Sequence, residues 1–329
     1  MCTIKKMLSR SLAFLYLVVF AATASAGFPD RPIEFIIPCG AGGGADIEGR
    51  LLAKEMSNIL GVPLTPINKP GAGGAITYTY IVNSKPDGYT IGWNSTSVLT
   101  TTNLGNTDFD YDAMDHIGRV EYQPQPFVVK ADSSWKSFQD FVSDCRSNPN
   151  TYKIANSGTG SATHTAAIAI MNAINCKVIH LPKGIKGRNA SVLSGEADAM
   201  VAPLTGAIRL SKAGKLRILA VPTSKRNMVI PDVPTMGELG YDAELDLFRG
   251  LSVAPGTPQS IKDKLFDAMS KAAKSKAFMG LAKKKGFTVD PMGPKAFTAF
   301  LSNENNKVKN IFKGGDLYKS KLLTSFKMS

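Results

Sequence analysis

The stretch that most constrains the fold is a glycine-dense turn after a short apolar run. Residues 33–37 read Ile-Glu-Phe-Ile-Ile, Pro38 interrupts them, and residues 40–44 contain four glycines. Glycine has no Cβ and adopts positive φ at little cost, so the backbone of such a turn can approach a ligand closely. The pattern predicts a strand, a turn with outward-facing amides, and then a helix.

The segment after this turn predicts an amphipathic helix from Asp46 to Leu60, with Asp46 as its N-cap. The first turn of a helix has free N–H groups and the positive end of the helix dipole, which favour a carboxylate or a similar anion. The alternative is a tight strand-to-helix connection that binds nothing. The apolar residues expected on one helix face are Ile47, Leu51, Leu52, Met56 and Ile59.

The first 26 residues predict a secretory signal peptide, and therefore a periplasmic protein. A basic start precedes the apolar run of residues 12–22, which is too short for a comfortable membrane span, and Ala24-Ser25-Ala26 offers a cleavage site. Cleavage after Ala26 would leave 329 − 26 = 303 residues, a length that suits two lobes better than one core.

The charge of the chain favours an acidic ligand over nucleic acid. The formal net charge is +13, and loss of Lys5, Lys6 and Arg10 with the signal peptide would lower it to +10. The lysines are dispersed along predicted helices rather than interleaved with aromatic residues, so we expect no nucleic-acid partner. The three histidines have no metal-ligand spacing, and we expect neither a metal site nor a cofactor.

Three cysteines follow the predicted cleavage site. In an oxidising compartment Cys145 and Cys176 could form a disulfide, which would leave Cys39 free in the glycine turn. Alternatively, both are small core residues. The second reading has support because Cys145 continues an apolar stripe formed by Trp135, Phe138, Phe141 and Val142.

Strand and helix patterns alternate along the chain and predict an α/β fold. Strands expected at 33–37, 63–67 and 89–93 are separated by helical segments, an order that gives parallel strands with their loops at one sheet edge. A second glycine turn at residues 156–164 again lies between a strand and a helix. Two such turns facing one another would form a cleft. The last eighteen residues are Lys-rich and predict a loosely held tail.

A series of motifs resembles one family along nearly all of the chain after residue 26. The sequence resembles the substrate-binding receptors of tripartite tricarboxylate transporters, the Bug family of periplasmic solute-binding proteins. The matching motifs are Pro38 with Gly42-Gly43-Gly44 and Asp46…Arg50, Asn68-Lys69-Pro70-Gly71-Ala72-Gly73-Gly74, Pro86-Asp87-Gly88-Tyr89-Thr90, Gly158…His164, Ala213-Gly214-Lys215-Leu216-Arg217, Pro231-Asp232-Val233-Pro234-Thr235 and Ala254-Pro255-Gly256-Thr257-Pro258.

The resemblance implies a type II periplasmic-binding-protein fold with a ligand cleft between two α/β lobes. Lobe 1 would comprise residues 27–124 and 247–329, and lobe 2 would comprise residues 125–246. Such a protein captures a small carboxylate, for example a di- or tricarboxylate, and delivers it to the membrane permease subunits of a tripartite transporter. We expect it to act as a monomer and not as an enzyme.

The resemblance also implies which residues hold the ligand, through main-chain amides, hydroxyls and bridging waters. About four or five hydrogen bonds to a charged group would suffice for micromolar binding, so no buried arginine is needed. The expected ligand-binding residues are Gly42, Gly43, Gly44, Asp46, Ser95, Ser97, Gly158, Thr159, Gly160, Ser161 and Thr163. Cys39 and Lys183 join them as departures, because the family usually has an aromatic residue and a tyrosine there. A smaller side chain on one wall of the cleft and a cation on the other suggest a roomier or more anionic ligand.

Three other readings compete with this one. Residues 40–45 fit the dinucleotide fingerprint GxGxxA of an oxidoreductase, but Pro38-Cys39 separates them from the strand and no ribose-binding acid ends the second strand. A hydrolase lacks its GxSxG turn, and Ser161 beside His164 is not a triad. A third possibility, a ligand-sensing partner of a signalling receptor, stays open.

Phe248 and Arg249 lie at the predicted second crossover and could reach the cleft. Alternatively, Arg249 pairs with an acid such as Asp246.

Overall fold

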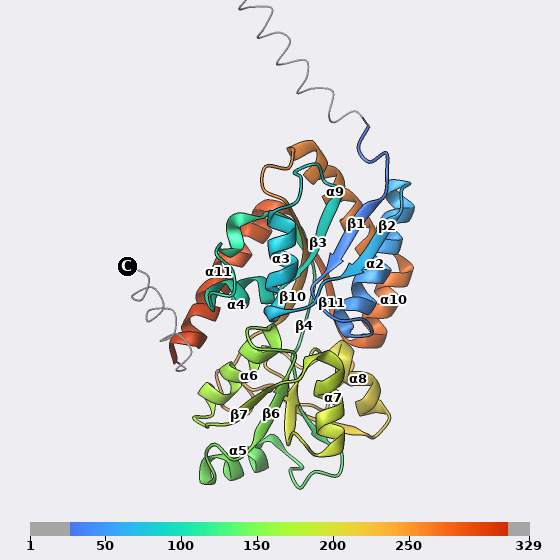
Figure 1. The fold of residues 1–329 in the computed structure, drawn as a ribbon. Coiled ribbons are helices and arrows are strands. Elements are labelled where there is room, and N and C mark those ends of the chain that lie inside the picture. Colours follow the sequence, from blue (N-terminus) through green and yellow to red (C-terminus); the bar gives the residue numbers. More distant parts are fainter. Residues whose placement is uncertain (1–26, 315–329) are drawn as a thin grey trace, which may run out of the picture.

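The computed structural model describes residues 27–314. The predicted signal peptide, residues 1–26, and residues 315–329 of the predicted Lys-rich tail lie outside the described residues. Figure 1 shows two lobes, one above the other, and each is built on its own mixed sheet with helices packed against it. The predicted two-lobed α/β architecture is confirmed.

Lobe 1 is built on a six-stranded sheet in the order β11-β4-β10-β3-β1-β2. The first three strands along the chain are parallel, as the alternation of strands and helices predicts, and the later three add antiparallel pairs. The strands are β1 (Ile33–Ile37), β2 (Leu64–Asn68), β3 (Thr90–Ser95), β4 (Asp115–Gln123), β10 (Leu247–Val253) and β11 (Thr288–Met292).

Helices cover both faces of this sheet. Successive residues of a strand point to opposite faces, and accordingly Ile37 belongs to one apolar core while Ile36 belongs to another. The first core contains α2 (Gly44–Leu60), α9 (Gln259–Ala273) and α10 (Lys276–Lys285). The second contains α3 (Ala75–Val82), α4 (Ser97–Asn103) and α11 (Pro294–Gly314), and two short 3-10 turns, η1 (Ala72–Gly74) and η2 (Tyr111–Ala113), complete the lobe.

Lobe 2 is built on a five-stranded sheet in the order β7-β6-β8-β5-β9. Its strands are β5 (Phe127–Lys130), β6 (Lys153–Asn156), β7 (Ile179–Pro182), β8 (Ala199–Val201) and β9 (Leu216–Ala220). Its helices are α5 (Phe138–Ser147), α6 (Ala162–Ala173), α7 (Gly184–Ser194) and α8 (Leu204–Lys212). The predicted capping box at Ser137 and Asp140 opens α5.

The chain crosses between the lobes twice, after β4 and before β10. Strand β4 was not predicted, because its polar residues interrupt the apolar pattern that marks a buried strand. Arg119 and Glu121 on β4 are buried and are paired, with Asp290 and Arg249 respectively. The contacts that allow charges in this strand therefore come from distant parts of the sequence.

Helix α2 forms where predicted and ends at Gly61, but two details differ. Gly43, not Asp46, is the N-cap, because the Asp46 carboxylate turns back to accept a 2.9 Å hydrogen bond from the Gly42 amide. Ile47 and Ile59 are exposed rather than part of the buried face. That face is formed by Ala45, Gly49, Leu52, Ala53 and Met56, whose spacing turns both isoleucines outward.

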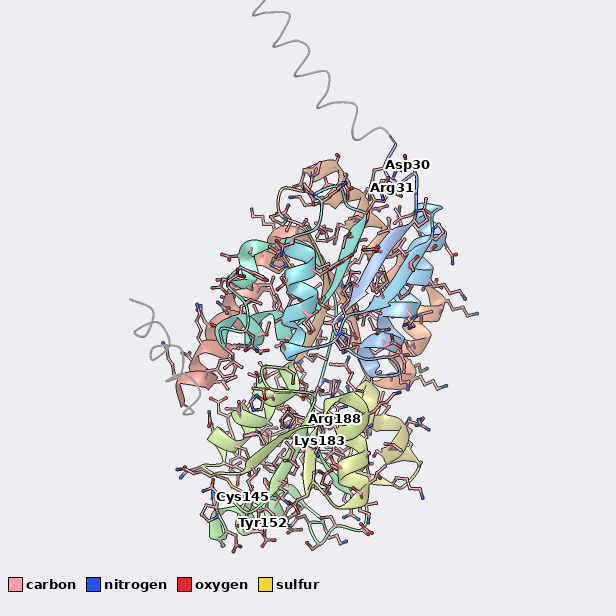
Figure 2. All side chains as sticks on the ribbon, viewed as in Figure 1. Asp30, Arg31, Cys145, Tyr152, Lys183 and Arg188 are labelled. Atoms are coloured by element: carbon pink, nitrogen blue, oxygen red, sulfur yellow. A yellow bond between two sulfur atoms is a disulfide. The ribbon has the colours of Figure 1, made fainter. Side chains whose placement is uncertain are left out.

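A disulfide joins Cys145 of α5 to Cys176, with their Cα atoms 6.0 Å apart. Both residues are also buried in the lobe 2 core, so the two roles left open by the sequence coexist. Cys145 lies toward the end of lobe 2 that is far from lobe 1 (Figure 2). Cys39 is a free thiol.

Reduction of this disulfide should destabilise the protein. The bond closes a loop with a sequence separation of 31 residues, for which the chain-entropy model gives about 3.5 kcal/mol of unfolding free energy. Guanidinium unfolding with and without reductant measures the difference. Cys39→Ala should respond to reductant as the wild type does, whereas Cys145→Ala should not respond. An unfolding free energy independent of reductant in the wild type would contradict the role assigned to this bond.

Candidate functional site

A cavity of about 320 Å³ lies between the two lobes, and residues of both glycine turns line it. Lobe 1 contributes Cys39, Gly44, Ala45, the loop 70–74, Ser95, Ser97 and Arg249 to its wall. Lobe 2 contributes Ser157, Gly158, Thr159, Ser161, Ala162, Thr163, Ile185, Arg188 and Gly206. Its position, beyond the carboxyl ends of β1 and β6, is where open α/β sheets bind ligands. Its volume suits a small molecule.

The structure brings most of the predicted ligand-binding residues to this cavity. Those on its wall are Cys39, Gly44, Ser95, Ser97, Gly158, Thr159, Ser161 and Thr163. Predicted residues that are not on the wall are Gly42, Gly43, Asp46, Gly160 and Lys183. Gly43 faces Ile185 of the other lobe, and Asp46 is engaged by Arg50 and Asn68.

Lys183 is a predicted ligand-binding residue that does not line the cavity. It is exposed, and its Nζ forms an ion pair with Glu196. The cation that lobe 2 places on the cavity wall is Arg188, five residues further along the chain in α7. Figure 2 shows both residues in the part of lobe 2 nearest lobe 1.

The lobe 1 wall presents the N-terminus of α2. Gly44 and Ala45 are the first residues of this helix, and amides at such positions have no partner within the helix. Both residues line the cavity, whereas the Gly42 amide is already used by Asp46. The hydroxyls of Ser95 and Ser97 lie beside them, 2.7 Å from one another. To an acidic ligand, these groups present hydrogen-bond donors and the positive end of a helix dipole.

The lobe 2 turn uses several of its own amides to hold its shape. Three amides of the turn donate to side chains of lobe 2: Ser157 to Thr163 Oγ1 (2.9 Å), Gly158 to Asn156 Oδ1 (2.9 Å) and Gly160 to His164 Nδ1 (3.3 Å). Because each of these amides has one proton and already donates it, the three cannot all donate to a ligand as well. Ser161 caps α6, and Ala162 and Thr163, the first residues of this helix, line the cavity.

The two lobes are in contact around the cavity. A Cβ on Gly73, which has a φ of +67°, would lie 2.8 Å from the backbone of Thr159 and Gly160, so loop 70–74 and the turn 156–164 touch main chain to main chain. Gln123 joins the lobes below them, donating to Glu48 (3.0 Å) and accepting from the Thr205 hydroxyl (2.8 Å). The structure is therefore a closed form.

Arg249 reaches the cavity wall, but acidic residues of lobe 1 neutralise it. Its Nε pairs with Glu48 and lies 3.3 Å from Glu121, and all three side chains are buried. Asp246 is not its partner, and Phe248 packs in the core. Burial and the neighbouring Glu48 raise the pKa of Glu121 well above its ordinary value, so Glu121 holds its proton to higher pH than an exposed glutamate does.

Arg188 is a second buried arginine on the wall, and the sequence analysis did not identify it as a site residue. Its side chain is 2% exposed. Its Nη1 donates to Ser157 Oγ (2.7 Å) and its Nε to Asn189 Oδ1 (3.4 Å), and no carboxylate within residues 27–314 pairs with it. Burial lowers its pKa to about 10, which still leaves it charged at pH 7.

The remaining reactive groups of the cavity do not form a catalytic or metal centre. Burial raises the pKa of the Cys39 thiol to about 12, so this cysteine is not a thiolate nucleophile at neutral pH. The His164 ring accepts from the Gly160 amide rather than from the Ser161 hydroxyl. Among residues 27–314, no group of histidines, cysteines and acids is arranged to hold a metal ion. In the same range, we find no helix with the length and hydropathy of a membrane span.

The two buried arginines should differ in their effect on stability. Arg249→Met leaves Glu48 buried without its counter-charge and should lower the free energy of unfolding by about 3–5 kcal/mol. Arg188→Met removes a charge that has no acidic partner and should change the free energy of unfolding by less than about 1 kcal/mol. Urea unfolding at neutral pH compares the variants. Equal destabilisation by both substitutions would contradict the assigned pairing.

Glu121 should make stability depend on pH in a defined direction. Above its unfolded pKa of 4.5, the folded protein retains a proton that the unfolded chain has released. The contribution of Glu121 to the free energy of unfolding therefore falls as pH rises, by up to about 1.4 kcal/mol per pH unit. Glu121→Gln has no proton to bind, and urea unfolding from about pH 5 to about pH 8 should show a less negative slope. Identical slopes would show that Glu121 is ionised in the fold.

Comparisons with known proteins agree with this geometry. Residues 49–317 match the family described as "Tripartite tricarboxylate transporter family receptor", TctC. A UPF0065 protein in the gbd 5′ region of Cupriavidus necator is 32% identical over 268 residues, which cover 80% of this chain and 82% of that protein.

Two solved structures share the fold. The periplasmic binding protein BugD has a TM-score of 0.82 at 28% identity, covering 87% of this chain and 98% of BugD. MatC from Rhodopseudomonas palustris, solved with bound malate, has a TM-score of 0.82 at 23% identity, covering 86% of this chain and 99% of MatC.

These matches extend over most of the chain and confirm the predicted resemblance. The family consists of transporter receptors, which bind solutes and are not enzymes, so the oxidoreductase and hydrolase readings are set aside. A cavity between two α/β lobes is the feature that such a receptor requires. The chain is a solute-binding protein of the tripartite tricarboxylate transporter receptor family.

Proposed function

We propose that this receptor works in the periplasm, after removal of residues 1–26, and that it carries a small di- or tricarboxylate to membrane permease subunits. The observation that carries the proposal is a cavity between the lobes whose wall includes the first residues of α2 and α6, both of which favour an anion. Glu48, behind that wall, is paired with Arg249. The bound malate of MatC is consistent with this ligand class.

The number of available donors is sufficient for useful affinity. Hydrogen bonds to a charged group contribute roughly 1.5–3 kcal/mol each. Four or five of them, from the α2 and α6 amides and the serine hydroxyls, would offset the cost of ordering the ligand and closing the lobes. About 8 kcal/mol, which corresponds to micromolar binding, would remain.

Lobe closure provides the signal that a permease can recognise. The closed form brings Gly73 against Gly160 and fixes Gln123 between α2 and α8. A ligand that bridges both walls stabilises this form relative to an open one, and so shifts the population toward it. We propose that the receptor is a monomer and that the permease binds the closed surface.

A ligand screen tests the proposal directly. We expect succinate, malate, adipate or citrate to raise the melting temperature of the protein lacking residues 1–26, because a micromolar ligand at about 1 mM stabilises the folded state by about 4 kcal/mol. 1,4-Diaminobutane, a diamine with the four-carbon chain of succinate, should not raise the melting temperature, because the cavity wall favours anions. Stabilisation by the diamine, or by none of the acids, would overturn the proposed ligand class.

Two glycine variants test whether the acid binds in the cleft. A Cβ on Gly44 would lie 3.1 Å from Thr205 Cβ across the cleft, so Gly44→Val should obstruct closure and weaken acid binding at least tenfold by calorimetry. Gly280 on α10 has open space around it, and Gly280→Val should bind as the wild type does. Unchanged binding by Gly44→Val would place the acid outside this cleft.

A further inference from the structure

We propose that Arg188 is the residue that binds the acidic group of the ligand, and that the closed form of this receptor requires an anion between Arg188 and the N-terminus of α2. This inference deepens the proposed function and rests on it. It makes a negatively charged group the obligatory feature of the ligand. It also assigns the decisive contact to a side chain rather than to the lobe 2 glycine turn.

The first observation is that Arg188 is buried and charged without a counter-charge. It is 2% exposed, yet no carboxylate within the described residues lies within pairing distance. The two acids in the first two turns of α2 are engaged elsewhere, Asp46 by Arg50 and Glu48 by Arg249. A buried charge without a partner is costly, so the fold retains a position that an anion would stabilise.

The second observation is that the guanidinium keeps donors for a ligand. Of its five N–H groups, the hydrogen bonds within residues 27–314 use one on Nη1, to Ser157, and one on Nε, to Asn189. A planar guanidinium with free N–H groups matches the two oxygens of a carboxylate. Arg188 lines the cavity, so these donors and a bound acid share one space.

The third observation is that Arg188 lies close to the N-terminus of α2 across the cleft. Neighbouring residues at the start of α8 lie near both: a Cβ on Gly206 would lie 3.5 Å from Arg188 Nη2, and Thr205 Cβ lies 3.1 Å from the position that a Cβ on Gly44 would take. Closure thus brings a guanidinium from lobe 2 toward the positive end of a helix in lobe 1. Without an anion these two ends repel, and with one both are stabilised.

The lobe 2 glycine turn is a weaker candidate for this role. Its Ser157, Gly158 and Gly160 amides already donate within the lobe. Ser157 also accepts from Arg188, which fixes the guanidinium against this turn. The turn therefore positions Arg188, and Arg188 binds the acid.

Calorimetric titration of the protein lacking residues 1–26 with succinate, malate, adipate and citrate tests the inference. For the acid that binds the wild type most tightly, we expect Arg188→Met to lower the affinity at least 100-fold. Arg188→Lys keeps the charge without the forked donors, and it should recover part of this loss. Lys183→Met removes a nearby surface cation and should change the affinity less than twofold. The melting temperature of Arg188→Met without acid should not fall, which separates lost binding from lost folding.

The outcomes distinguish this inference from the proposed function. If the wild type binds an acid and Arg188→Met binds it equally well, the inference is wrong while the proposed function stands. An equal loss in Lys183→Met would assign the effect to general surface charge and would also overturn it. If the wild type binds none of the four acids, the proposed function fails, and the inference fails with it.

Discussion

Closure of two lobes over a cavity removes polar and charged groups of both lobes from water, and every such group then needs a partner. Most of them find one in the protein. Glu48 is matched by Arg249 and Gln123, and Asp46 by Arg50 and the Gly42 amide. On the cavity wall, the groups that no acid of the described residues pairs with are positive: the first amides of two helices and the guanidinium of Arg188. We propose that an acid of matching size binds between them.

The parts of the fold that local chemistry determines could be predicted from the sequence. Strand β1, the glycine turn and α2 follow from an apolar run, four glycines and an amphipathic period, and the αL conformation of Gly61 ends the helix. The capping box at Ser137 is also local. The parts that depend on distant pairing could not be predicted. Strand β4 carries buried charges, and the partners of Arg119 and Glu121 lie on β11 and β10.

The site shows the same division. The two glycine turns were placed correctly at the cavity because each follows a strand and precedes a helix. Their individual amides could not be assigned, since their hydrogen bonds depend on the side chains of Asp46, Asn156 and His164. Lys183 and Arg188 lie five positions apart in one basic segment. Only the start of α7 at Gly184 decides that Lys183 faces solvent while Arg188 faces the cavity.

A crystal structure of the protein lacking residues 1–26 with its tightest-binding acid would show directly whether an anion joins the two lobes at one place. We expect an acid oxygen within hydrogen-bond distance of an Arg188 guanidinium nitrogen, with the same acid group facing the Gly44 and Ala45 amides. A bound acid that leaves Arg188 without a contact, or an Arg188 paired with a protein carboxylate, would contradict it.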